Sequence, residues 1–429
     1  MKWRENQQQP KNQILICNDQ FRICFTRNPI HVKTKMLKIM KHGLWILFIS
    51  AVILFPSCSS GTKAANESVI EERGGVTYVH NPAVPLHPDK TAVFTEELRI
   101  EPEDSDGNVL YSRPGFFLVD GRGFMYIADV QELDFKVFDP EGRMVQTIGT
   151  SGSGPGEFQY IDSAGFTPEG RLLVLDSGLF RTSFFGKDGI FLDEFRWSQK
   201  YGGLFLVKEN SYLTQEYIPD EKGTGYGFTV LELDFNGQKV QTYGEFSPPE
   251  SQDMTIDGKT FGIPIPRSPS SVFAGDPETG RLYHCYSSEY RIEVYDRSGQ
   301  LTRVIDRPYT RTAFSTAEKR AIREQVGANL QGKMGSGIPD IKIPSYKPVT
   351  DFMLADESGS LWVVTNETRD ENGTELTAVD IFDAEGRYDA RLWLENIPGS
   401  FKNGKMYRFA VDEYTGYSSL VRYSVSRQQ

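Results

Sequence analysis

Apolar residues occur along most of this chain in short runs separated by turns rich in Asp, Gly and Pro. In one unit, four such runs follow one another at residues 116–119, 124–128, 135–138 and 144–148. The turns Asp120–Gly123 and Asp139–Gly142 separate the first run from the second and the third from the fourth. Glycine supplies the positive φ that tight hairpins need, so the unit predicts four short antiparallel strands.

This unit recurs along the chain at fixed offsets. Segments that start at Gly123, Gly170 and Gly280 align without a gap, with an aromatic residue fifteen positions later and a glycine nineteen positions later. Three looser copies start at Asn210, Gly359 and Gly404, and a large side chain stands three residues after all six origins. Six copies of four strands predict an all-β fold, a six-bladed β-propeller with four-stranded antiparallel blades.

Two segments outside the complete copies add to this prediction. The last copy ends after residues 417–424 and lacks its outermost strand, which residues 93–100 are expected to supply, so that the N- and C-terminal segments pair and close the ring. Ser315 to Glu318 forms a capping box and Gly327 is a helix-stop signal, which together predict a short inserted helix over 316–326.

The N-terminal region reads as a secretion signal. The apolar run Leu44–Phe55 has 12 residues, too few to span a bilayer, and follows Lys38 and Lys41. Cys58 just after this run resembles the lipobox cysteine of bacterial lipoproteins, although Phe55, Pro56 and Ser57 replace the usual residues before it. We therefore expect a lipid on Cys58 and a membrane-tethered protein of the cell envelope, outside the cytoplasm. Plain signal cleavage and an ordinary membrane anchor are the alternatives.

These features divide the chain into three parts. Residues 1–57 form an upstream extension plus signal peptide, with Met36 or Met40 as the expected true start; 58–75 form a lipid-attached linker, and 76–429 form the propeller. Removal of 1–57 takes away nine Lys or Arg and two Asp or Glu, which changes the net charge from −11 to about −18. So acidic a protein is a poor partner for nucleic acid.

One stretch resembles a known repeat signature. Ile148–Phe158, which follows Val137–Asp139, is similar to the inter-blade sequence of NHL-type propellers. The whole mature chain resembles the six-bladed propeller lipoproteins of Bacteroidetes-type bacteria, with an NHL-repeat-like or TolB-like propeller. The resemblance implies the fold and an envelope location, and it is silent on function because propellers host enzymes, sugar binders and docking platforms.

Strand order predicts which face of the propeller binds. Loops between second and third strands leave a blade at the same face as the connections between blades. The four longest segments, 215–227, 246–269, 308–347 and 366–375, all belong to these two classes. Long loops on a rigid scaffold commonly build binding sites, although tolerance of loop insertions is an alternative explanation.

Ten residues on or near this face are candidate binding residues: Asp129, Asp134, Asp176, Arg181, Tyr286, Glu289, Tyr290, Arg291, Tyr346 and Lys347. Asp129 and Asp176 end equivalent strands, where an Asp can cap its own turn or contact a ligand or Ca²⁺.

Catalytic signals are sparse. The mature chain has three histidines, His80, His87 and His284, which argues against propeller enzymes that use several His for zinc or a His pair for lactone hydrolysis. Cys285 is expected to be buried packing, and no catalytic residue is assigned. The leading prediction is an envelope binding module for a glycan, peptide or protein partner. The alternative is a calcium-dependent, lactonase-like hydrolase or lyase at the channel mouth, with calcium as the cofactor.

Overall fold

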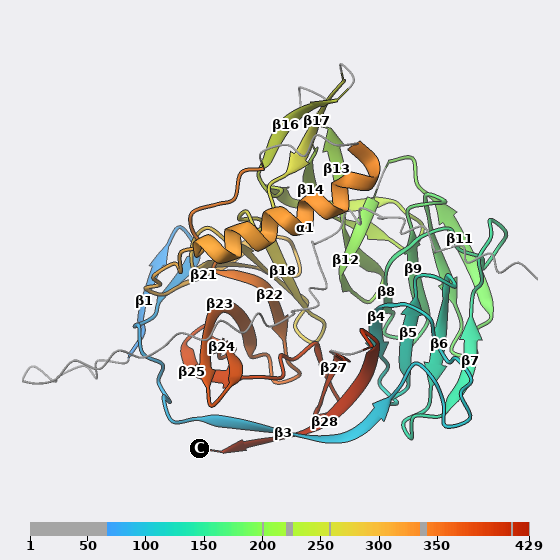
Figure 1. Ribbon diagram of the computed structural model, residues 1–429, viewed down its shortest axis with the longest axis horizontal. Coiled ribbons are helices and arrows are strands. Elements are labelled where there is room, and N and C mark those ends of the chain that lie inside the picture. Colours follow the sequence, from blue (N-terminus) through green and yellow to red (C-terminus); the bar gives the residue numbers. More distant parts are fainter. Residues whose placement is uncertain are drawn as a thin grey trace, which may run out of the picture.

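Six four-stranded antiparallel sheets are arranged as the blades of a propeller (Figure 1), which confirms the predicted fold. The computed structural model describes residues 67–428, apart from residue 200 and residues 220–225, 257–258, 335–340 and 413–414. The predicted signal, the two alternative start sites and Cys58 lie outside the described residues.

Blades 1 to 3 follow the chain from the inner to the outer strand. Blade 1 holds β4 (Pro114–Val119), β5 (Met125–Asp129), β6 (Asp134–Phe138) and β7 (Met144–Ile148). Blade 2 holds β8 (Ile161–Phe166), β9 (Leu172–Asp176), β10 (Arg181–Phe185) and β11 (Phe191–Arg196). Blade 3 holds β12 (Tyr201–Val207), β13 (Ser211–Pro219), β14 (Tyr226–Asp234) and β15 (Lys239–Phe246).

Blades 4 and 5 repeat this order, and blade 6 completes the ring. Blade 4 holds β18 (Ser271–Asp276), β19 (Arg281–Tyr286), β20 (Arg291–Tyr295) and β21 (Leu301–Asp306). Blade 5 holds β22 (Thr350–Ala355), β23 (Leu361–Glu371), β24 (Thr374–Phe382) and β25 (Tyr388–Leu394). Blade 6 holds β26 (Ser400–Lys402), β27 (Lys405–Val411), β28 (Ser418–Gln428) and β3 (Thr91–Ile100).

The ring closes as predicted. β3, from the N-terminal part of the chain, pairs antiparallel with the last strand β28, from Ile100 opposite Leu420 to Thr91 opposite Gln428. Ile100 is buried, and Phe94 of the same strand packs against the cores of blades 5 and 6. The N-terminal segment therefore fills the position of the missing outer strand and covers the edge of β28.

A second N-terminal hairpin extends blade 4. β1 (Val69–Arg73) and β2 (Val76–His80) pair with each other, and β2 lies parallel to β21, so that this sheet has six strands. β1 falls within the predicted linker 58–75, so a strand of the propeller sheet lies up to seven residues before the predicted boundary at residue 76.

The core lies mainly between neighbouring blades. Phe135, Phe158 and Phe185 are almost fully buried at the contact of blades 1 and 2, with ring centroids 6.2 Å and 5.7 Å apart along the series. Phe158 ends the stretch 148–158, and its backbone N–H donates to the carbonyl of Thr150 at 2.7 Å. This stretch therefore serves to fold an aromatic side chain back into the contact between blades.

The inserted helix is longer than predicted. α1 runs from Thr316 to Met334 and is capped as expected, because the N–H of Ser315 donates to Glu318 at 2.8 Å and the N–H of Glu318 donates to the Ser315 hydroxyl at 3.2 Å. The expected stop at Gly327 was wrong: this glycine does not adopt positive φ, and an internal glycine weakens a helix by about 1 kcal/mol without ending it. Among the residues that the structure describes, no helix is long and apolar enough to cross a membrane.

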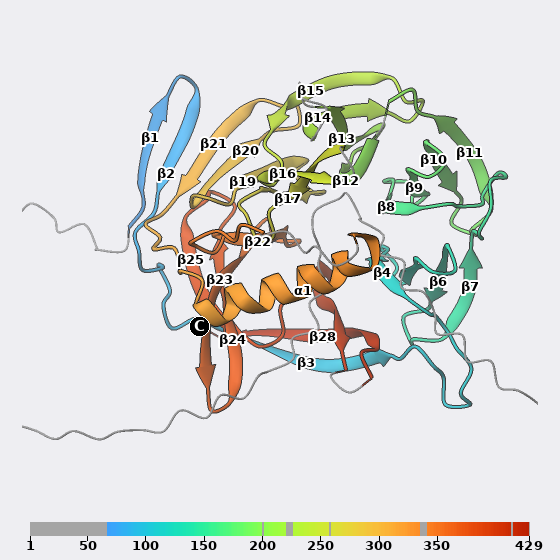
Figure 2. The same cartoon turned by 45° about the horizontal axis from the view of Figure 1, so that its top comes forward.

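We call the face that carries the blade-to-blade connections the long-loop face. α1 and the hairpin of β16 (Ser251–Ile256) and β17 (Lys259–Pro264) both belong to such connections. Figures 1 and 2 show α1 lying across the ring on this face. The segment after α1 reaches the hairpin, since the N–H of Lys342 donates to the side chain of Gln252 at 2.9 Å. The predicted grouping of long segments on one face agrees with the strand order.

The inner strands of blades 3 and 4 approach too closely for a side chain at Gly275. A Cβ there would lie 2.1 Å from the carbonyl oxygen of Phe205 and 3.1 Å from Cβ of Leu206. We therefore expect Gly275→Ala to lower the free energy of unfolding by about 1–3 kcal/mol, the usual cost of overpacking. Gly121→Ala is the matched control, because nothing lies within 4 Å of its Cβ position. Equal urea midpoints for the two variants would contradict this packing of blades 3 and 4.

Candidate functional site

An open cavity of about 430 Å³ lies on the long-loop face where blade 4 leads into blade 5. The connection after β21 forms one wall, and the extended β23–β24 hairpin with β25 forms the other. The lining residues are Arg307, Pro308, Tyr309, Thr310, Thr312, Lys347, Glu367, Thr368 and Trp393. Most of these side chains are polar, and two aromatic rings lie among them.

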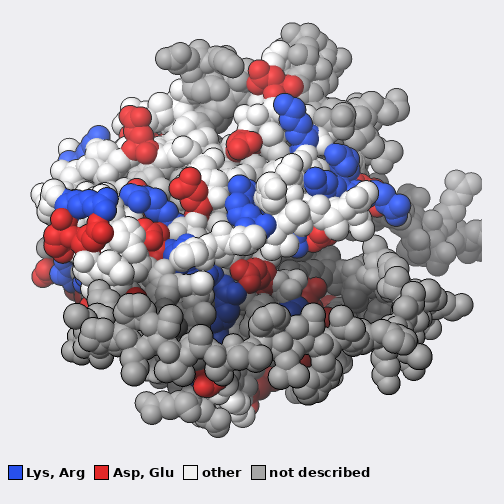
Figure 3. All heavy atoms as spheres, turned by 90° about the vertical axis from the view of Figure 1, so that its left-hand side faces the viewer, with Lys and Arg blue, Asp and Glu red and all other residues white. Residues whose placement is uncertain are grey.

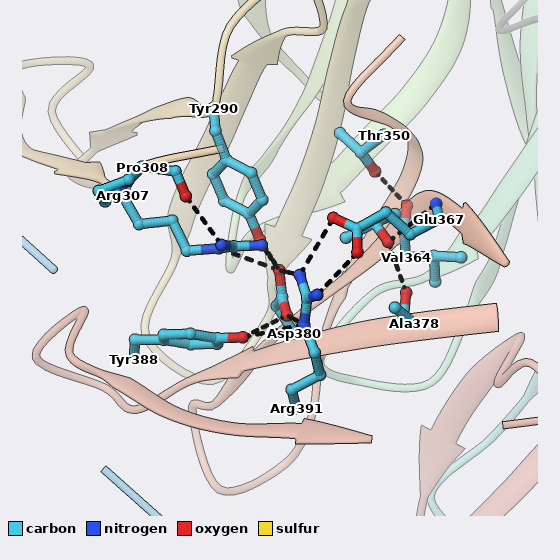
Figure 4. A network of polar contacts seen from close by, with 11 residues as sticks. Tyr290, Arg307, Pro308, Thr350, Val364, Glu367, Ala378, Asp380, Tyr388 and Arg391 are labelled. Atoms are coloured by element: carbon cyan, nitrogen blue, oxygen red, sulfur yellow. Dashed lines mark hydrogen bonds and ion pairs between the residues drawn. The ribbon is translucent and has the colours of Figure 1, made fainter. Parts of the chain in front are cut away.

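A buried ionic network supports the wall of this cavity (Figure 4). Asp380 of β24 is fully buried, and one of its oxygens accepts from Nη2 of Arg307 at 2.6 Å and from the Tyr290 hydroxyl at 2.7 Å. The other oxygen accepts from Nε of Arg391 and from the Tyr388 hydroxyl, both at 2.7 Å. Each carboxylate oxygen therefore accepts from at least two donors, and such pairing is the condition under which a buried charge is tolerated.

The charges in this network balance. Burial alone would raise the pKa of Asp380, but Arg307 and Arg391 hold it below its ordinary value. Arg391 also pairs with Glu367 at 2.8 Å, so two guanidinium groups meet two carboxylates. Burial and the Asp380 charge raise the pKa of the Tyr290 hydroxyl, which stays a hydrogen-bond donor. The network is thus a neutral, rigid support with its ionised groups already paired.

Three tyrosine rings surround the Arg307 guanidinium. Its central carbon lies 4.4 Å from the ring centroid of Tyr290, 4.9 Å from that of Tyr388 and 5.3 Å from that of Tyr309. Tyr309 lines the cavity, and its buried hydroxyl has no hydrogen-bond partner among the residues that the structure describes. Aromatic faces stabilise a cation and limit its rotation, so Arg307 has a fixed position beside the cavity.

The rim of the cavity is linked to α1. Nζ of Lys347 lies 2.7 Å from Glu318, the residue that caps the start of α1. The ammonium also lies over the ring of Phe314, at 5.9 Å from its centroid. On the opposite rim, Arg369 covers one face of the Trp393 indole at 4.5 Å. The two rims therefore present a lysine and an aromatic ring held by neighbouring side chains.

Two of the predicted site residues make structural contacts. Asp129 is fully buried and accepts from the backbone N–H groups of Ser112, Arg113, Gln131 and Glu132 at 2.5–3.2 Å. Asp176 accepts in the same way from Gln159, Tyr160 and Leu179 at 2.9–3.1 Å. Each Asp accepts hydrogen bonds from its own turn and from the segment that enters its blade. These contacts agree with the alternative in which the Asp caps its own turn.

Asp134 and Arg181 are also engaged inside the protein. Asp134 pairs with Lys136 at 2.5 Å, and burial raises its pKa. The buried guanidinium of Arg181 pairs with Glu194 at 2.5 Å and donates to the carbonyls of Gly154 and Glu157. The structure places these two residues in blades 1 and 2, on the other side of the ring from the cavity.

The remaining candidates lie near the junction of blades 4 and 5. Tyr290 belongs to the Asp380 network and Lys347 lines the cavity. Tyr346 is 48% exposed beneath Arg311, and Arg291 is half-exposed near Glu293. Tyr286 is half-buried, which raises its pKa, and Glu289 is exposed in the turn after it. Their roles in binding stay predictions.

Sequence reasoning missed the residues that build the cavity: Arg307, Tyr309, Glu367, Asp380, Tyr388, Arg391 and Trp393. One signal was present, because Asp380 interrupts the apolar run Ala378–Phe382, and an ionised residue inside a buried strand needs a partner. The partners were not identifiable, since Arg307 stands 73 positions away in another blade connection.

A second polar chain lies between blades 3 and 4. Nε2 of His284 lies 3.1 Å from the Ser271 hydroxyl and Nδ1 lies 3.2 Å from Glu293. Ser271 and His284 are both 8% exposed, and the rings of Phe246 and Phe273 flank the imidazole at 4.5 Å and 5.0 Å. This arrangement satisfies polar groups inside a hydrophobic contact.

The predicted calcium cofactor would need a group of oxygen ligands. Among the described residues, no group of three or more His, Cys, Asp or Glu side chains is placed to hold a metal ion. The predicted calcium-assisted hydrolase or lyase therefore has no assigned residues in this part of the chain.

Of the comparisons with known proteins, one solved structure with a TM-score above 0.5 supports the fold. No protein-family model and no curated protein matches the chain. A member of the DUF4221 family from Bacteroides vulgatus is similar in structure, with a TM-score of 0.51 and 13% identity over 79% of this chain and 99% of that one. A putative exported protein from Bacteroides fragilis matches with a TM-score of 0.46 and 12% identity over 82% and 100%. A gluconolactonase from Xanthomonas campestris matches with a TM-score of 0.39 and 11% identity over 77% and 99%.

Proposed function

We propose that this protein is a binding module of the cell envelope, tethered by a lipid on Cys58, which takes a glycan in the cavity between blades 4 and 5. The observation that carries the proposal is the cavity itself. It lies on the long-loop face, and its volume falls within the range of about 300–1,000 Å³ typical of small-molecule sites.

The lining suits a ligand rich in hydroxyl groups. Trp393 and Tyr309 offer aromatic surface against which a sugar ring can pack. Glu367 accepts hydrogen bonds, Lys347 donates them, and the hydroxyls of Thr310, Thr312 and Thr368 do both. The Asp380 network fixes Arg307 and, through Arg391, Glu367 before any ligand arrives. Such preorganisation lowers the entropy cost of binding.

The envelope location rests on the sequence. The short apolar run Leu44–Phe55 follows two lysines and precedes small residues and Cys58, which supports secretion followed by lipid attachment. A propeller presented outside the cytoplasm would meet polysaccharides and glycoproteins of the surroundings. Peptide and protein partners remain outcomes of the binding test below.

The test is binding of the purified chain from residue 58 to an array of immobilised bacterial and host oligosaccharides, followed by calorimetric titration of the best one. We expect saturable binding that Trp393→Ala weakens by about tenfold or more, a loss of about 1.4 kcal/mol, because the substitution removes the aromatic surface against which the sugar ring packs.

Phe180→Ala is the matched control. Phe180 is 46% exposed in a turn of blade 2, so its replacement removes a surface aromatic ring away from the cavity. The proposal requires this variant to bind as the unmodified protein does. Selective binding of a peptide or protein would reassign the ligand class, and equal affinity of the Trp393 and Phe180 variants for the selected sugar would reject the cavity as its site.

A further inference from the structure

The strand register of blade 4 shows at which end of the sheet the N-terminal tether emerges. The turn from β19 to β20, at residues 287–290, belongs to the long-loop face. At the same end, Arg291 lies opposite Asp306, Asp306 opposite His80, and His80 opposite Val69. Val69 is the first residue of β1, so the chain enters the propeller at its long-loop face.

This entry point lies close to the cavity. The side chain of His80 contacts the Asp306 carboxylate at 2.9 Å, and the next residue, Arg307, lines the cavity. Adjacent strands lie about 4.8 Å apart, so β1 begins on the order of 10 Å from β21. The hydroxyl of Ser68 donates to Asn81 at 2.6 Å, which fixes the chain just before β1.

The tether itself is short. Ten residues lead from Cys58 to Ser68. A chain of this length reaches at most about 35 Å when fully extended. Because the opposite face lies a further strand length away, about 20 Å, the cavity end of blade 4 is the end that such a tether keeps near the bilayer.

The connection between blades 4 and 5 lies near the point where the chain enters the propeller. The charge of this connection is compatible with contact to a lipid surface. Residues 308–327 and 341–349 carry six Lys or Arg and two Glu, although the mature protein has a net charge of about −18. Arg320 on α1 is exposed, with a side-chain exposure of 78%. Each basic residue near an anionic lipid surface contributes on the order of 1 kcal/mol. Figure 3 shows basic and acidic side chains interspersed on the side where β1 lies, so this attraction is local.

We propose that the tether holds the cavity sector of the long-loop face, at blades 4 and 5, toward the membrane that carries the lipid. This inference rests on the lipid attachment proposed above. It adds that α1 and the described parts of the connection, 308–315 and 341–349, lie against the bilayer surface, and that the cavity takes ligands at that surface. The turns at the opposite end of the blades, including 296–299, then point away from the membrane.

The test measures energy transfer to the bilayer from α1 and from the turn at the opposite end of blade 4. The lipidated protein is reconstituted in vesicles of phosphatidylcholine and phosphatidylglycerol that contain a rhodamine-labelled lipid. A donor dye is attached to Gln325→Cys on α1 or to Gln300→Cys at the far end of β21; both native side chains are exposed. Lipid occupies the Cys58 sulfur, and burial raises the pKa of Cys285 to about 12, so the introduced thiol is the one that reacts.

We expect transfer from position 325 to exceed that from position 300 by about twofold or more, given a separation on the order of 20 Å. Equal or reversed transfer in a protein whose lipid is confirmed by mass spectrometry would overturn the orientation and leave the cavity proposal standing. Absence of lipid on Cys58 would overturn the tether and the orientation together. Glycan binding by the cavity is measured separately and depends on neither result.

Discussion

A chain that begins at residue 101 is expected to lose its cooperative fold. This truncation removes β3, exposes the whole edge of β28 and leaves blade 6 with three strands. It also removes Ile100, Leu98 and Phe94 from the cores at this end of the ring. Each such side chain is worth about 1.5–3 kcal/mol when buried, and the lost strand pairing adds to this sum. The total approaches the entire stability of a typical domain, about 5–15 kcal/mol.

A chain that begins at Asn81 is the control for this truncation. It loses β1 and β2 and keeps β3, so blade 4 returns to four strands and the ring stays closed. Its thermal transition, followed by circular dichroism, is expected to remain cooperative. A cooperative transition of similar midpoint in the chain that begins at residue 101 would show that the ring does not depend on β3.

Asp380→Ala is expected to lower the free energy of unfolding by about 3–5 kcal/mol, because it leaves Arg307 and Arg391 in a buried site without their shared carboxylate. Glu367→Ala is the matched control, since Glu367 pairs with the same Arg391 from a position that is 26% exposed. Its loss should cost about 1 kcal/mol or less. Urea unfolding of both variants measures the difference, and equal costs would contradict the central role of Asp380.

The contribution of Asp380 to the free energy of unfolding should decrease as the pH falls. Its pKa is lower in the folded protein than in the unfolded chain, so the ionised group stabilises the fold above the ordinary carboxyl range. That contribution is lost as the pH falls from about 4 toward the folded pKa. The stability difference between the unmodified protein and Asp380→Ala should therefore be constant near neutral pH and shrink in acid.

The sequence allowed the propeller to be predicted because a turn glycine recurs at the same offset in the three clearest repeats. Gly142 and Gly189 adopt positive φ in the turn between the third and fourth strands. A Cβ on either would also collide with the outer strand of the preceding blade, at Leu98 and at Gln146. The positive φ favours glycine over residues with a Cβ, so the glycine recurs at a fixed offset and the period can be read from the sequence.

The cavity was beyond prediction for the opposite reason. Its residues come from the connection after β21, from the β23–β24 hairpin and from β25, and the Trp of β25 does not recur in the outer strands of the other blades. Asp129 and Asp176 attracted attention because they repeat, and their repeated position reflects a repeated structural role. In this propeller, residues that recur in several blades belong to the scaffold. A site formed at a single junction between blades is recognised only from the contacts that the structure shows.

A crystal structure of the protein with the oligosaccharide selected on the array tests the account most directly. We predict a sugar ring against Trp393, with its hydroxyl groups within hydrogen-bond distance of Glu367 and Lys347 and with the Asp380 network unchanged. A sugar bound on the opposite face or in the central channel, with the cavity between blades 4 and 5 empty, would contradict the account.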